Sequence, residues 1–385
     1  MNTPIYLDYN ATTPVAPEVL ETMLPWLREQ FGNPSSAHPY GQRAAQAVAT
    51  ARHQVADLIG AKPQEIFFTG CATEANHLAL LGIARTFGVE ARHLVVSAIE
   101  HPAVMAPALQ LRQQGWGVTV LPVDEYGQVS PAQLADALQP DTALVSIMHA
   151  NNEVGTLQPI HEIARITRPR GILLHTDAAQ SAGKLPLQVD ELGVDLLTLA
   201  GHKFYAPKGV GALYVRHGTP IQPLMLGGGQ EHGLRSGTEN VPALVGLGAA
   251  AALARAALPG ATIHLRELRD HLHALLATAV PGLQLNGHPD HRLPNTLHLS
   301  FPGVSGSRLL HEAGHSVAAS VGSACHSEHD AVSGVLAAMG VSAARAAGAV
   351  RLSVGGMTTP EEITRAARSL IAAWQRLMGQ EMKSN

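Results

Sequence analysis

The chain has 385 residues, with 26 Lys and Arg against 30 Asp and Glu, so its formal net charge is −4. Hydrophobic residues make up 46% and charged residues 15%, which supports a large buried core and excludes a disordered chain. The near-neutral charge and 4% of aromatic residues argue against a nucleic-acid partner. The two cysteines, Cys71 and Cys325, cannot form a disulfide framework, so we expect a reducing, cytoplasmic location.

The first half of the chain alternates short apolar runs with longer amphipathic ones. The apolar runs predict strands at residues 66–69, 93–98, 117–122, 143–149, 171–175, 196–200 and 211–215. The amphipathic runs predict helices at residues 74–87, 104–114, 131–138 and 160–167. This alternation is typical of an α/β domain with a mostly parallel sheet that is buried on both faces. Ligands of such sheets bind at the carboxyl ends of the strands, so we expect functional residues there.

The pattern changes after residue 238. An Ala- and Leu-rich region at 241–279 predicts two helices that break at Pro259-Gly260, and it is too interrupted to predict a membrane span. Strands at 296–301, 317–320 and 350–354 and helices at 307–313 and 360–378 then predict a smaller α+β domain. We therefore predict a large domain at residues 15–255 and a small domain formed by residues 1–14 and 256–385.

Lys203 is the lysine whose position in the sequence indicates a chemical role. The chain has five lysines, and only Lys203 directly follows a predicted buried strand, after Gly201-His202. A desolvated lysine at the mouth of a parallel sheet is typical of an amine that reacts with a carbonyl cofactor. A surface lysine on a loop is the alternative.

Two further features suit pyridoxal phosphate. Asp177 ends the apolar run at 172–177, where a carboxylate can keep a pyridine nitrogen protonated, although it can equally cap the helix that follows. The turn at 69–76 joins a strand to a helix, and its backbone N–H groups and the Thr73 hydroxyl suit a phosphate. Capping alone would also explain Thr73 and Glu74.

Nine motifs occur in the order found in cysteine desulfurases, which the chain resembles over nearly its whole length. This family is a branch of the class V aminotransferases. The motifs are Asp8-Tyr-Asn-Ala-Thr-Thr-Pro14, Gly32-Asn-Pro-Ser-Ser36, Ala72-Thr-Glu74, Glu100-His101, Asn151-Asn-Glu-Val-Gly155, His175-Thr-Asp-Ala-Ala-Gln180, Gly201-His-Lys203, Arg235-Ser-Gly-Thr238 and Gly322-Ser-Ala-Cys325. Two stretches, Gly227-Gly-Gly-Gln-Glu231 and Cys325-His-Ser-Glu-His329, also resemble the related selenocysteine lyases.

The resemblance implies a homodimeric fold-type-I enzyme with pyridoxal 5'-phosphate as cofactor, a large seven-stranded sheet domain and a smaller α+β domain. Lys203 would bind the cofactor and move protons, Asp177 would pair with the ring nitrogen, and His101 would lie over the ring. The remaining cofactor contacts would come from Gln180 and Asn152 near the ring hydroxyl and from Ala72, Thr73, His202 and the partner subunit's Thr238 at the phosphate. Arg351 would bind the substrate carboxylate with help from Asn33.

The two cysteines differ in what the resemblance implies. Cys325 would accept sulfur as a persulfide, and a nearby imidazole such as His326 would favour its thiolate. A buried structural cysteine, or a metal ligand together with His326 and His329, are the alternatives for Cys325. Cys71 stands where relatives commonly have glycine, and a space-filling role fits it better than a nucleophilic one. Ala200 replaces a serine of many relatives and so removes one hydroxyl from the expected phosphate site.

We therefore expect a cysteine desulfurase that converts L-cysteine to L-alanine and passes sulfur through Cys325 to an acceptor protein. A selenocysteine lyase that releases selenide from L-selenocysteine is the first alternative. An ordinary class V aminotransferase and a non-catalytic sulfur- or metal-binding scaffold are the others. The substrate would be a small molecule, and we expect no nucleic-acid or membrane partner.

Overall fold

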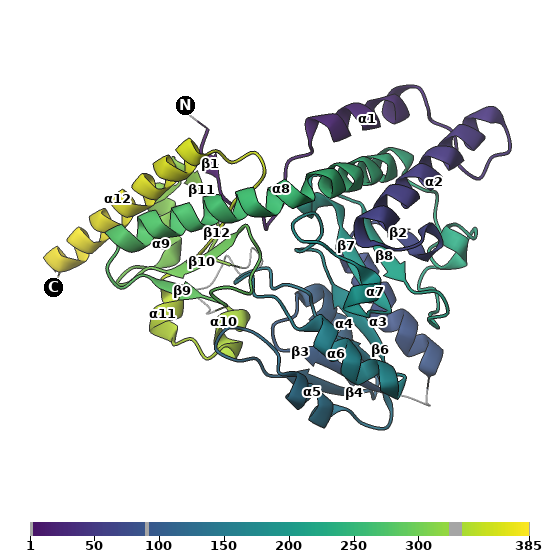
Figure 1. Cartoon of the computed structure of the whole chain (residues 1–385), viewed down its shortest axis with the longest axis horizontal. Coiled ribbons are helices and arrows are strands. Elements are labelled where there is room, and N and C mark those ends of the chain that lie inside the picture. The colour runs from purple at the N-terminus through teal and green to yellow at the C-terminus, as the bar shows by residue number, and fades with distance from the viewer. Residues whose placement is uncertain (1–2, 89–91, 323–332, 385) are drawn as a thin grey trace.

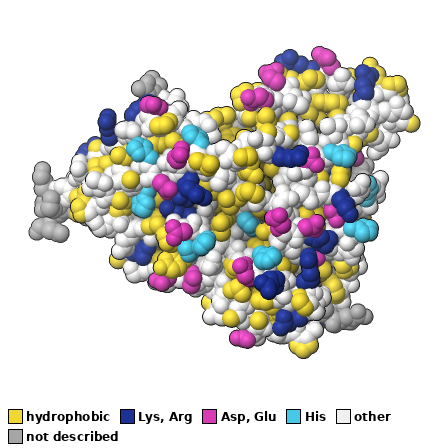
Figure 2. All heavy atoms as spheres, in the orientation of Figure 1, with side chains coloured by type: hydrophobic (Ala, Val, Ile, Leu, Met, Phe, Trp, Pro, Cys, Tyr) yellow, Lys and Arg dark blue, Asp and Glu magenta, His cyan; other side chains and the backbone are white. Residues whose placement is uncertain are grey.

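The computed structural model describes residues 3–88, 92–322 and 333–384. Figure 1 shows two lobes joined by the long helix α8 (Val241–Ala279), with the larger lobe on the right. On the face shown in Figure 2, the described Lys and Arg side chains are mixed with Asp and Glu side chains over both lobes. This mixing agrees with the small net charge of the chain.

A seven-stranded sheet forms the centre of the large lobe. Only β8 runs antiparallel to its neighbours, and the other neighbouring pairs are parallel. The predicted α/β class with a mostly parallel sheet is therefore confirmed. In sheet order the strands are β2 (Ile66–Thr69), β8 (Gly211–Val215), β7 (Leu196–Ala200), β6 (Leu173–Asp177), β5 (Thr142–Ser146), β3 (His93–Ser97) and β4 (Gly117–Leu121).

Helices cover both faces of this sheet because its strands alternate apolar side chains between the faces. Leu197 and Leu199 of β7 pack on one face, whereas Leu196 packs on the other. The first face is covered by α1 (Pro17–Arg28), α2 (Pro39–Ile59), α5 (Pro131–Ala137), α6 (Ile160–Thr167), α7 (Val189–Leu192) and the first half of α8. The second face is covered by α3 (Ala72–Phe87) and α4 (Pro102–Gln113).

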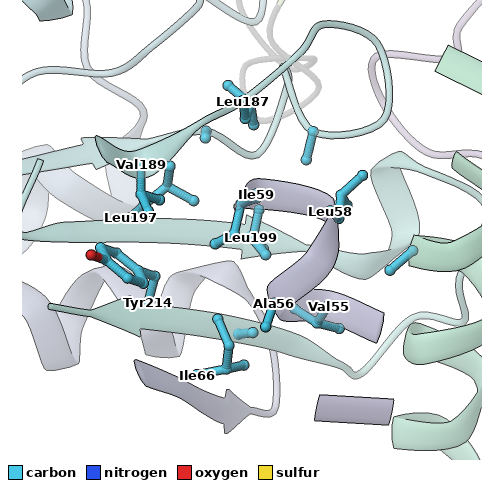
Figure 3. Close-up of a cluster of buried hydrophobic side chains, with 14 of the residues drawn as sticks. Val55, Ala56, Leu58, Ile59, Ile66, Leu187, Val189, Leu197, Leu199 and Tyr214 are labelled. Carbon is cyan, nitrogen blue, oxygen red and sulfur yellow. The ribbon is translucent and has the colours of Figure 1, made fainter. Parts of the chain in front are cut away.

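Figure 3 shows the contact between α2 and the sheet. Val55, Ala56 and Ile59 of α2 lie against Leu199 of β7 and Ile66 of β2. All five side chains are almost completely buried. This packing holds α2 against the sheet near the carboxyl end of β7.

The predicted break of α8 at Pro259-Gly260 is wrong, because α8 is one continuous helix. Pro259 removes one backbone hydrogen bond, but it lies in an exposed stretch where water can replace that bond. Buried residues before it pack in the large lobe, and Leu265 to Leu276 pack in the small lobe. Packing at both ends therefore keeps the helix continuous through the proline.

By length and composition α8 could also cross a membrane, yet half of its most apolar window is buried within the two lobes. Such burial is typical of a core helix. The expected absence of a membrane span remains a prediction. The predicted domain boundary at residue 255 falls inside α8 and also remains a prediction.

The small lobe combines two small sheets with helices. An antiparallel sheet contains β12 (Ala349–Ser353), β10 (Thr296–Ser300) and β9 (Gln284–Asn286), and a parallel pair contains β1 (Ile5–Tyr6) and β11 (Val317–Ala318). The helices of this lobe are α9 (Gly306–Ala313), α10 (Gly334–Ala338), α11 (Ala343–Ala347) and α12 (Pro360–Ser384). Side chains of α8, α9, α12, β10 and β12 form its apolar core.

Three buried histidines make the fold sensitive to acid. Burial lowers the pKa of His149 and His175 to about 4 and that of His298 to about 3. The unfolded chain, whose histidines titrate near pH ~6.5, binds more protons below that pH than the folded chain does. The part of the stability that depends on these histidines is therefore fully present above pH ~6.5 and falls toward pH 4, by roughly 1 kcal/mol per pH unit for each histidine. Burial raises the pKa of Glu100 to about 8, so this carboxyl contributes in the opposite direction. As a single group, it offsets only part of the stability lost through the three histidines.

Chemical unfolding at pH 7.5 and pH 5 measures this loss in the wild type and in His298→Leu. The His298 Nε2 atom is buried without a partner among the described residues. Leucine removes this titrating ring and the contact of its Nδ1 atom with Asn286 Nδ2, which keeps its bond to Ser300 Oγ. Between pH 7.5 and pH 5, the free energy of unfolding of the variant is expected to fall less than that of the wild type, by the contribution of one histidine. An identical pH dependence in the two proteins would contradict the assignment.

Candidate active site

A cavity of about 380 Å³ lies at the carboxyl ends of the sheet strands, where the two lobes meet. Its lining includes side chains from the ends of β6 and β7, from the start of α3 and from β12. The cavity brings together most of the predicted site residues, namely Ala72, Thr73, His101, Asn152, Asp177, Gln180, His202, Lys203 and Arg351.

Three predicted residues are not part of this lining. Asn33 and Thr238 together line a second cavity of about 260 Å³, next to α1 and the start of α8. Cys325 lies outside the described residues, as do His326 and His329. The described residues nearest to Cys325 in sequence are Gly322 and Ser333, and Gly322 and Gly334 both line the first cavity.

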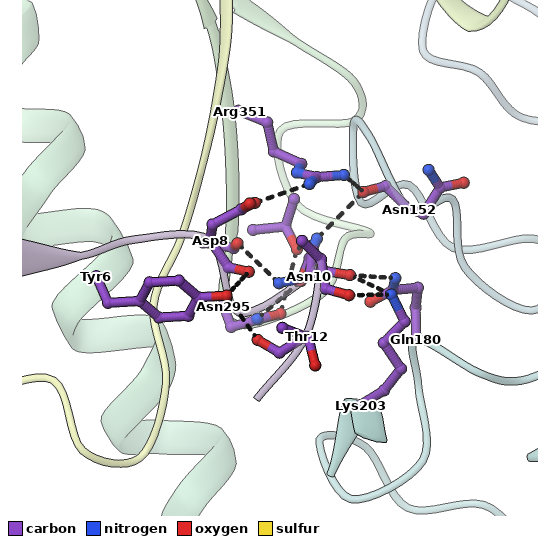
Figure 4. A network of polar contacts seen from close by, with 12 residues as sticks. Tyr6, Asp8, Asn10, Thr12, Asn152, Gln180, Lys203, Asn295 and Arg351 are labelled. Carbon is purple, nitrogen blue, oxygen red and sulfur yellow. Dashed lines mark hydrogen bonds and ion pairs between the residues drawn. The ribbon is translucent and has the colours of Figure 1, made fainter. Parts of the chain in front are cut away.

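Lys203 ends a 3₁₀ turn (Gly201–Lys203) that directly follows β7. Its Nζ atom donates to the backbone oxygens of Asn10 at 2.6 Å and Ala11 at 2.8 Å (Figure 4). Burial, reinforced by the charge of Arg351, lowers the pKa of Lys203 to about 8, although Asp177 acts in the opposite direction. Lys203 therefore has a substantial neutral fraction near pH 8, and a neutral amine is the nucleophilic form.

Asp177 is the last residue of β6, and both of its carboxylate oxygens are held. Oδ2 accepts from Asn76 Nδ2 at 2.6 Å, and Oδ1 accepts from the Ala179 backbone N–H at 2.9 Å. Asn76 is completely buried in the first turns of α3. Asn76 was not among the predicted site residues, although its place one helical turn after Ala72 and Thr73 was a usable signal.

The start of α3 forms one wall of the cavity. Cys71, which is exposed, occupies its N-cap position without a side-chain cap, so backbone N–H groups of the first turn are available to an anion. Across from them, a Cβ atom on Gly211 would lie 2.9 Å from the Cys71 carbonyl carbon and 3.0 Å from the Ala72 nitrogen. Glycine therefore lets β8 approach the turn closely.

His101 and Glu100 also line the cavity. The His101 Nδ1 atom accepts from the Ala103 N–H at 3.1 Å, so the neutral ring carries its proton on Nε2. Burial lowers the pKa of His101, with Lys203 acting in the same direction and Asp177 against it. Glu100 accepts from Ser97 and from the Met148 N–H, and burial raises its pKa to about 8. Glu100 was not among the predicted site residues.

Arg351 reaches the cavity from β12 of the small lobe. Its Nη2 atom donates to Asp8 Oδ1 at 2.8 Å, and its Nη1 atom donates to the Asn152 backbone oxygen at 3.0 Å. Arg351 is 3% exposed, so these contacts fix a buried guanidinium in one orientation. A fixed guanidinium suits a carboxylate ligand. Asp8 belongs to a motif of the sequence, but the motif did not reveal this contact.

The N-terminal segment ties the two lobes together at the cavity (Figure 4). The Asn10 Nδ2 atom donates to Thr296 Oγ1 at 2.8 Å, and its Oδ1 atom accepts from Asn295 Nδ2 at 3.0 Å, both in the small lobe. Its backbone oxygen accepts from Lys203 and, at 3.0 Å, from Gln180 Nε2, both in the large lobe. Asn10 therefore couples the Lys203 amine to the position of the small lobe.

Comparisons with known proteins agree on one family. Residues 5–366 match the family described as aminotransferase class V. The chain is 46% identical to the cysteine desulfurase IscS of Dictyoglomus turgidum, over 94% of this chain and 92% of that protein.

Solved structures give the same result. A NifS-like protein matches with a TM-score of 0.91 and 40% identity, covering 97% of this chain and all of that one. The structure titled "SspA in complex with cysteine" matches with a TM-score of 0.81 and 39% identity, covering 91% of this chain and 98% of that one. The chain therefore belongs to the cysteine desulfurases of the aminotransferase class V family, which are enzymes that depend on pyridoxal phosphate.

Proposed function

We propose that the protein converts L-cysteine to L-alanine and transfers the sulfur to the thiol of Cys325. One observation carries this proposal: a single cavity between the lobes holds the amine of Lys203, the carboxylate of Asp177 and the guanidinium of Arg351. An amine for the cofactor, a carboxylate for its ring and a cation for the substrate are the groups that this chemistry needs. The relative whose structure is titled as a complex with cysteine supports the choice of substrate.

The residues present fit pyridoxal phosphate. The uncapped start of α3 at Ala72 and Thr73, with His202 nearby in the cavity lining, suits its phosphate. Asp177 has a fixed carboxylate for the ring nitrogen, and Lys203 supplies the amine that binds the carbonyl carbon. Gln180 and Asn152 line the same cavity and suit the ring hydroxyl. When bound, the cofactor withdraws electrons from the α-carbon of the substrate and so acidifies its hydrogen.

The protein's own side chains then supply binding and proton transfer. Arg351 binds the α-carboxylate of the substrate, and Asp8 and Asn152 keep its guanidinium in place. The Lys203 Nζ atom takes the α-proton, for which its lowered pKa suits it. The neutral His101 ring, held through Nδ1, has its Nε2 proton free to donate within the cavity.

The sulfur step balances without an outside oxidant. The Cys325 thiolate attacks the sulfur of the substrate, the C–S bond breaks with its electron pair going to the substrate carbon, and that carbon gains a proton. L-cysteine and one enzyme thiol thereby give L-alanine and one enzyme persulfide. We propose that this persulfide is then passed to an acceptor protein.

Incubation with L-cysteine and with L-selenocysteine in separate reactions tests this function. We expect alanine from cysteine, with an equal amount of sulfur on Cys325 before a reductant is added. Selenide and alanine from selenocysteine alone would make the protein a selenocysteine lyase, an alternative that Ala200 in the cavity lining keeps open. Amino transfer to a keto acid, without release of sulfur, would make it an ordinary aminotransferase. If no amino acid is turned over, the remaining alternative is a non-catalytic sulfur- or metal-binding scaffold.

We also propose that two copies form the active unit and exchange Thr238. In one chain Thr238 lines the second cavity with Asn33 and another cavity with Thr69 and Gly70, but it is not part of the lining of the first cavity. Phe31, which lines the second cavity, is 77% exposed, and Leu226 is 83% exposed. Exposed apolar surface of this kind is typical of a protein interface.

Sedimentation is expected to give a dimer, and Phe31→Glu is expected to shift it toward monomer with loss of activity. The carboxylate that this substitution introduces would be buried in the interface without a partner. Exposed Ile263→Glu, on α8, is the matched control and is expected to leave the dimer intact. A wild-type monomer with bound cofactor and full activity would contradict the proposal.

A further inference from the structure

Lys184 is a second buried lysine beside the candidate site, and the roles given above do not use it. It lies in the turn that follows β6 and is 6% exposed. Its Nζ atom donates to Gln180 Oε1 at 3.1 Å. Within the described part of the chain, this amine has no carboxylate within salt-bridge distance. Gln180 is thus the polar side chain that this amine contacts.

Keeping a lysine at this place costs stability. Burial of an unpaired ammonium group is unfavourable. Burial, together with the charges of Lys203 and Arg351, lowers the pKa of Lys184 to about 7. On the side of α8, the neutral Thr262 hydroxyl donates to the Lys184 backbone oxygen. An apolar side chain of the same length would avoid this cost. A contribution to stability therefore does not explain why a lysine occupies this position.

The contact with Gln180 selects one orientation of the Gln180 amide. A glutamine side chain can rotate by half a turn and exchange the places of its oxygen and nitrogen. Lys184 donates to Oε1, which leaves Nε2 to donate to the Asn10 backbone oxygen at 3.0 Å. In the rotated state the amide oxygen would face the Asn10 oxygen, and two acceptors would repel each other.

The Asn10 oxygen is also an acceptor for the reactive lysine. Lys203 Nζ lies 2.6 Å from it, so Gln180 and Lys203 donate to the same carbonyl group (Figure 4). A carbonyl oxygen that already has one donor binds a second donor less strongly. Gln180 therefore weakens the hold of Asn10 on the protonated Lys203 amine.

We propose that Lys184 is a positioning residue that acts on Lys203 through Gln180 and the Asn10 carbonyl. By keeping the Gln180 amide nitrogen on that carbonyl, Lys184 eases the loss of the proton from Lys203. This inference rests on the proposed function in one respect, namely that Lys203 is the reactive amine. The chain of contacts itself involves only atoms of this protein.

Lys184→Met removes the donor and keeps the length of the side chain. In the holoenzyme, the midpoint of the pH titration of the cofactor's visible absorption is expected to rise. In the full-length chain without cofactor, we expect the pH profile of Lys203 acylation by acetic anhydride, read by mass spectrometry, to shift upward. The size expected for one lost hydrogen bond is about 0.5 to 1 pH unit. Lys62→Met makes the same change at an exposed lysine and is expected to shift neither profile.

A double-mutant cycle separates this role from a merely structural one. In the Gln180→Ala background, Lys184 can no longer act on the Asn10 carbonyl through the Gln180 amide. Lys184→Met is therefore expected to shift the acylation profile of Lys203 by less than about 0.2 pH unit. An equal shift in both backgrounds, or no shift in the wild-type background, would overturn the proposal. If Lys184→Met does not fold, Lys184→Leu serves in its place. Should borohydride fix the cofactor to another lysine, the proposed function fails, but the acylation profiles still decide the role of Lys184.

Discussion

Replacing Lys203 with alanine is expected to abolish covalent cofactor binding and to lower turnover of L-cysteine by at least about 10⁴-fold. The same amine is assigned two tasks, to bind the cofactor and to carry the α-proton, and both are lost with it. Lys203 lies partly buried at the end of β7, where desolvation and the charge of Arg351 lower its pKa to about 8. The Asn10 and Ala11 carbonyls accept hydrogen bonds from its amine and hold it in place.

The measurement combines the visible absorption of the cofactor, borohydride reduction and the rate of alanine formation. Borohydride is expected to fix the cofactor to the peptide that contains Lys203 in the wild type and to no peptide of the variant. Lys208→Ala, at an exposed lysine of the following loop, is the matched control and is expected to keep full activity. A label on Lys208 or Lys184 in the wild type would show that Lys203 is the wrong residue.

The large sheet could be predicted from the sequence because its strands are buried on both faces and read as apolar runs. For β6, however, the apolar pattern predicted the wrong bounds. We predicted residues 171–175, but the strand is Leu173–Asp177. Gly171 has a φ of +67° and ends a turn, whereas the polar His175 lies fully buried inside the sheet. His175 is tolerated there because Ser146 and Thr198 satisfy its ring nitrogens, and such distant partners leave no trace in local hydropathy.

Most of the residues predicted for the site line the cavity, but the sequence did not show how they are held. Asp8 contacts Arg351 across 343 positions of the chain, and Asn76 contacts Asp177 across 101 positions. Such pairs depend on how the two lobes and the sheet strands meet, which no local pattern encodes. For the same reason the sequence did not show that the Asn10 backbone oxygen serves both Lys203 and Gln180.

Replacing Cys325 with alanine is expected to lower alanine formation from L-cysteine by at least about 10³-fold, with cofactor binding retained. A thiolate is a poor leaving group from carbon, so the substrate sulfur needs a nucleophile to receive it. Cys325 itself lies outside the described residues. Gly322 and Gly334, which flank its segment in sequence, both line the cavity that holds Lys203 and Arg351. Selenium leaves carbon more readily, so activity on L-selenocysteine is expected to survive in part.

Cys71→Ala is the matched control for this variant, because Cys71 is an exposed thiol that lines the same cavity. As the N-cap of α3 it makes no side-chain hydrogen bond to the helix, so alanine removes a thiol without removing a cap. Its rate is expected to stay within about threefold of the wild type. Mass spectrometry after one turnover is expected to find the additional sulfur on the Cys325 peptide. Full turnover in Cys325→Ala, with sulfur on Cys71, would move the acceptor role to the thiol at the start of α3.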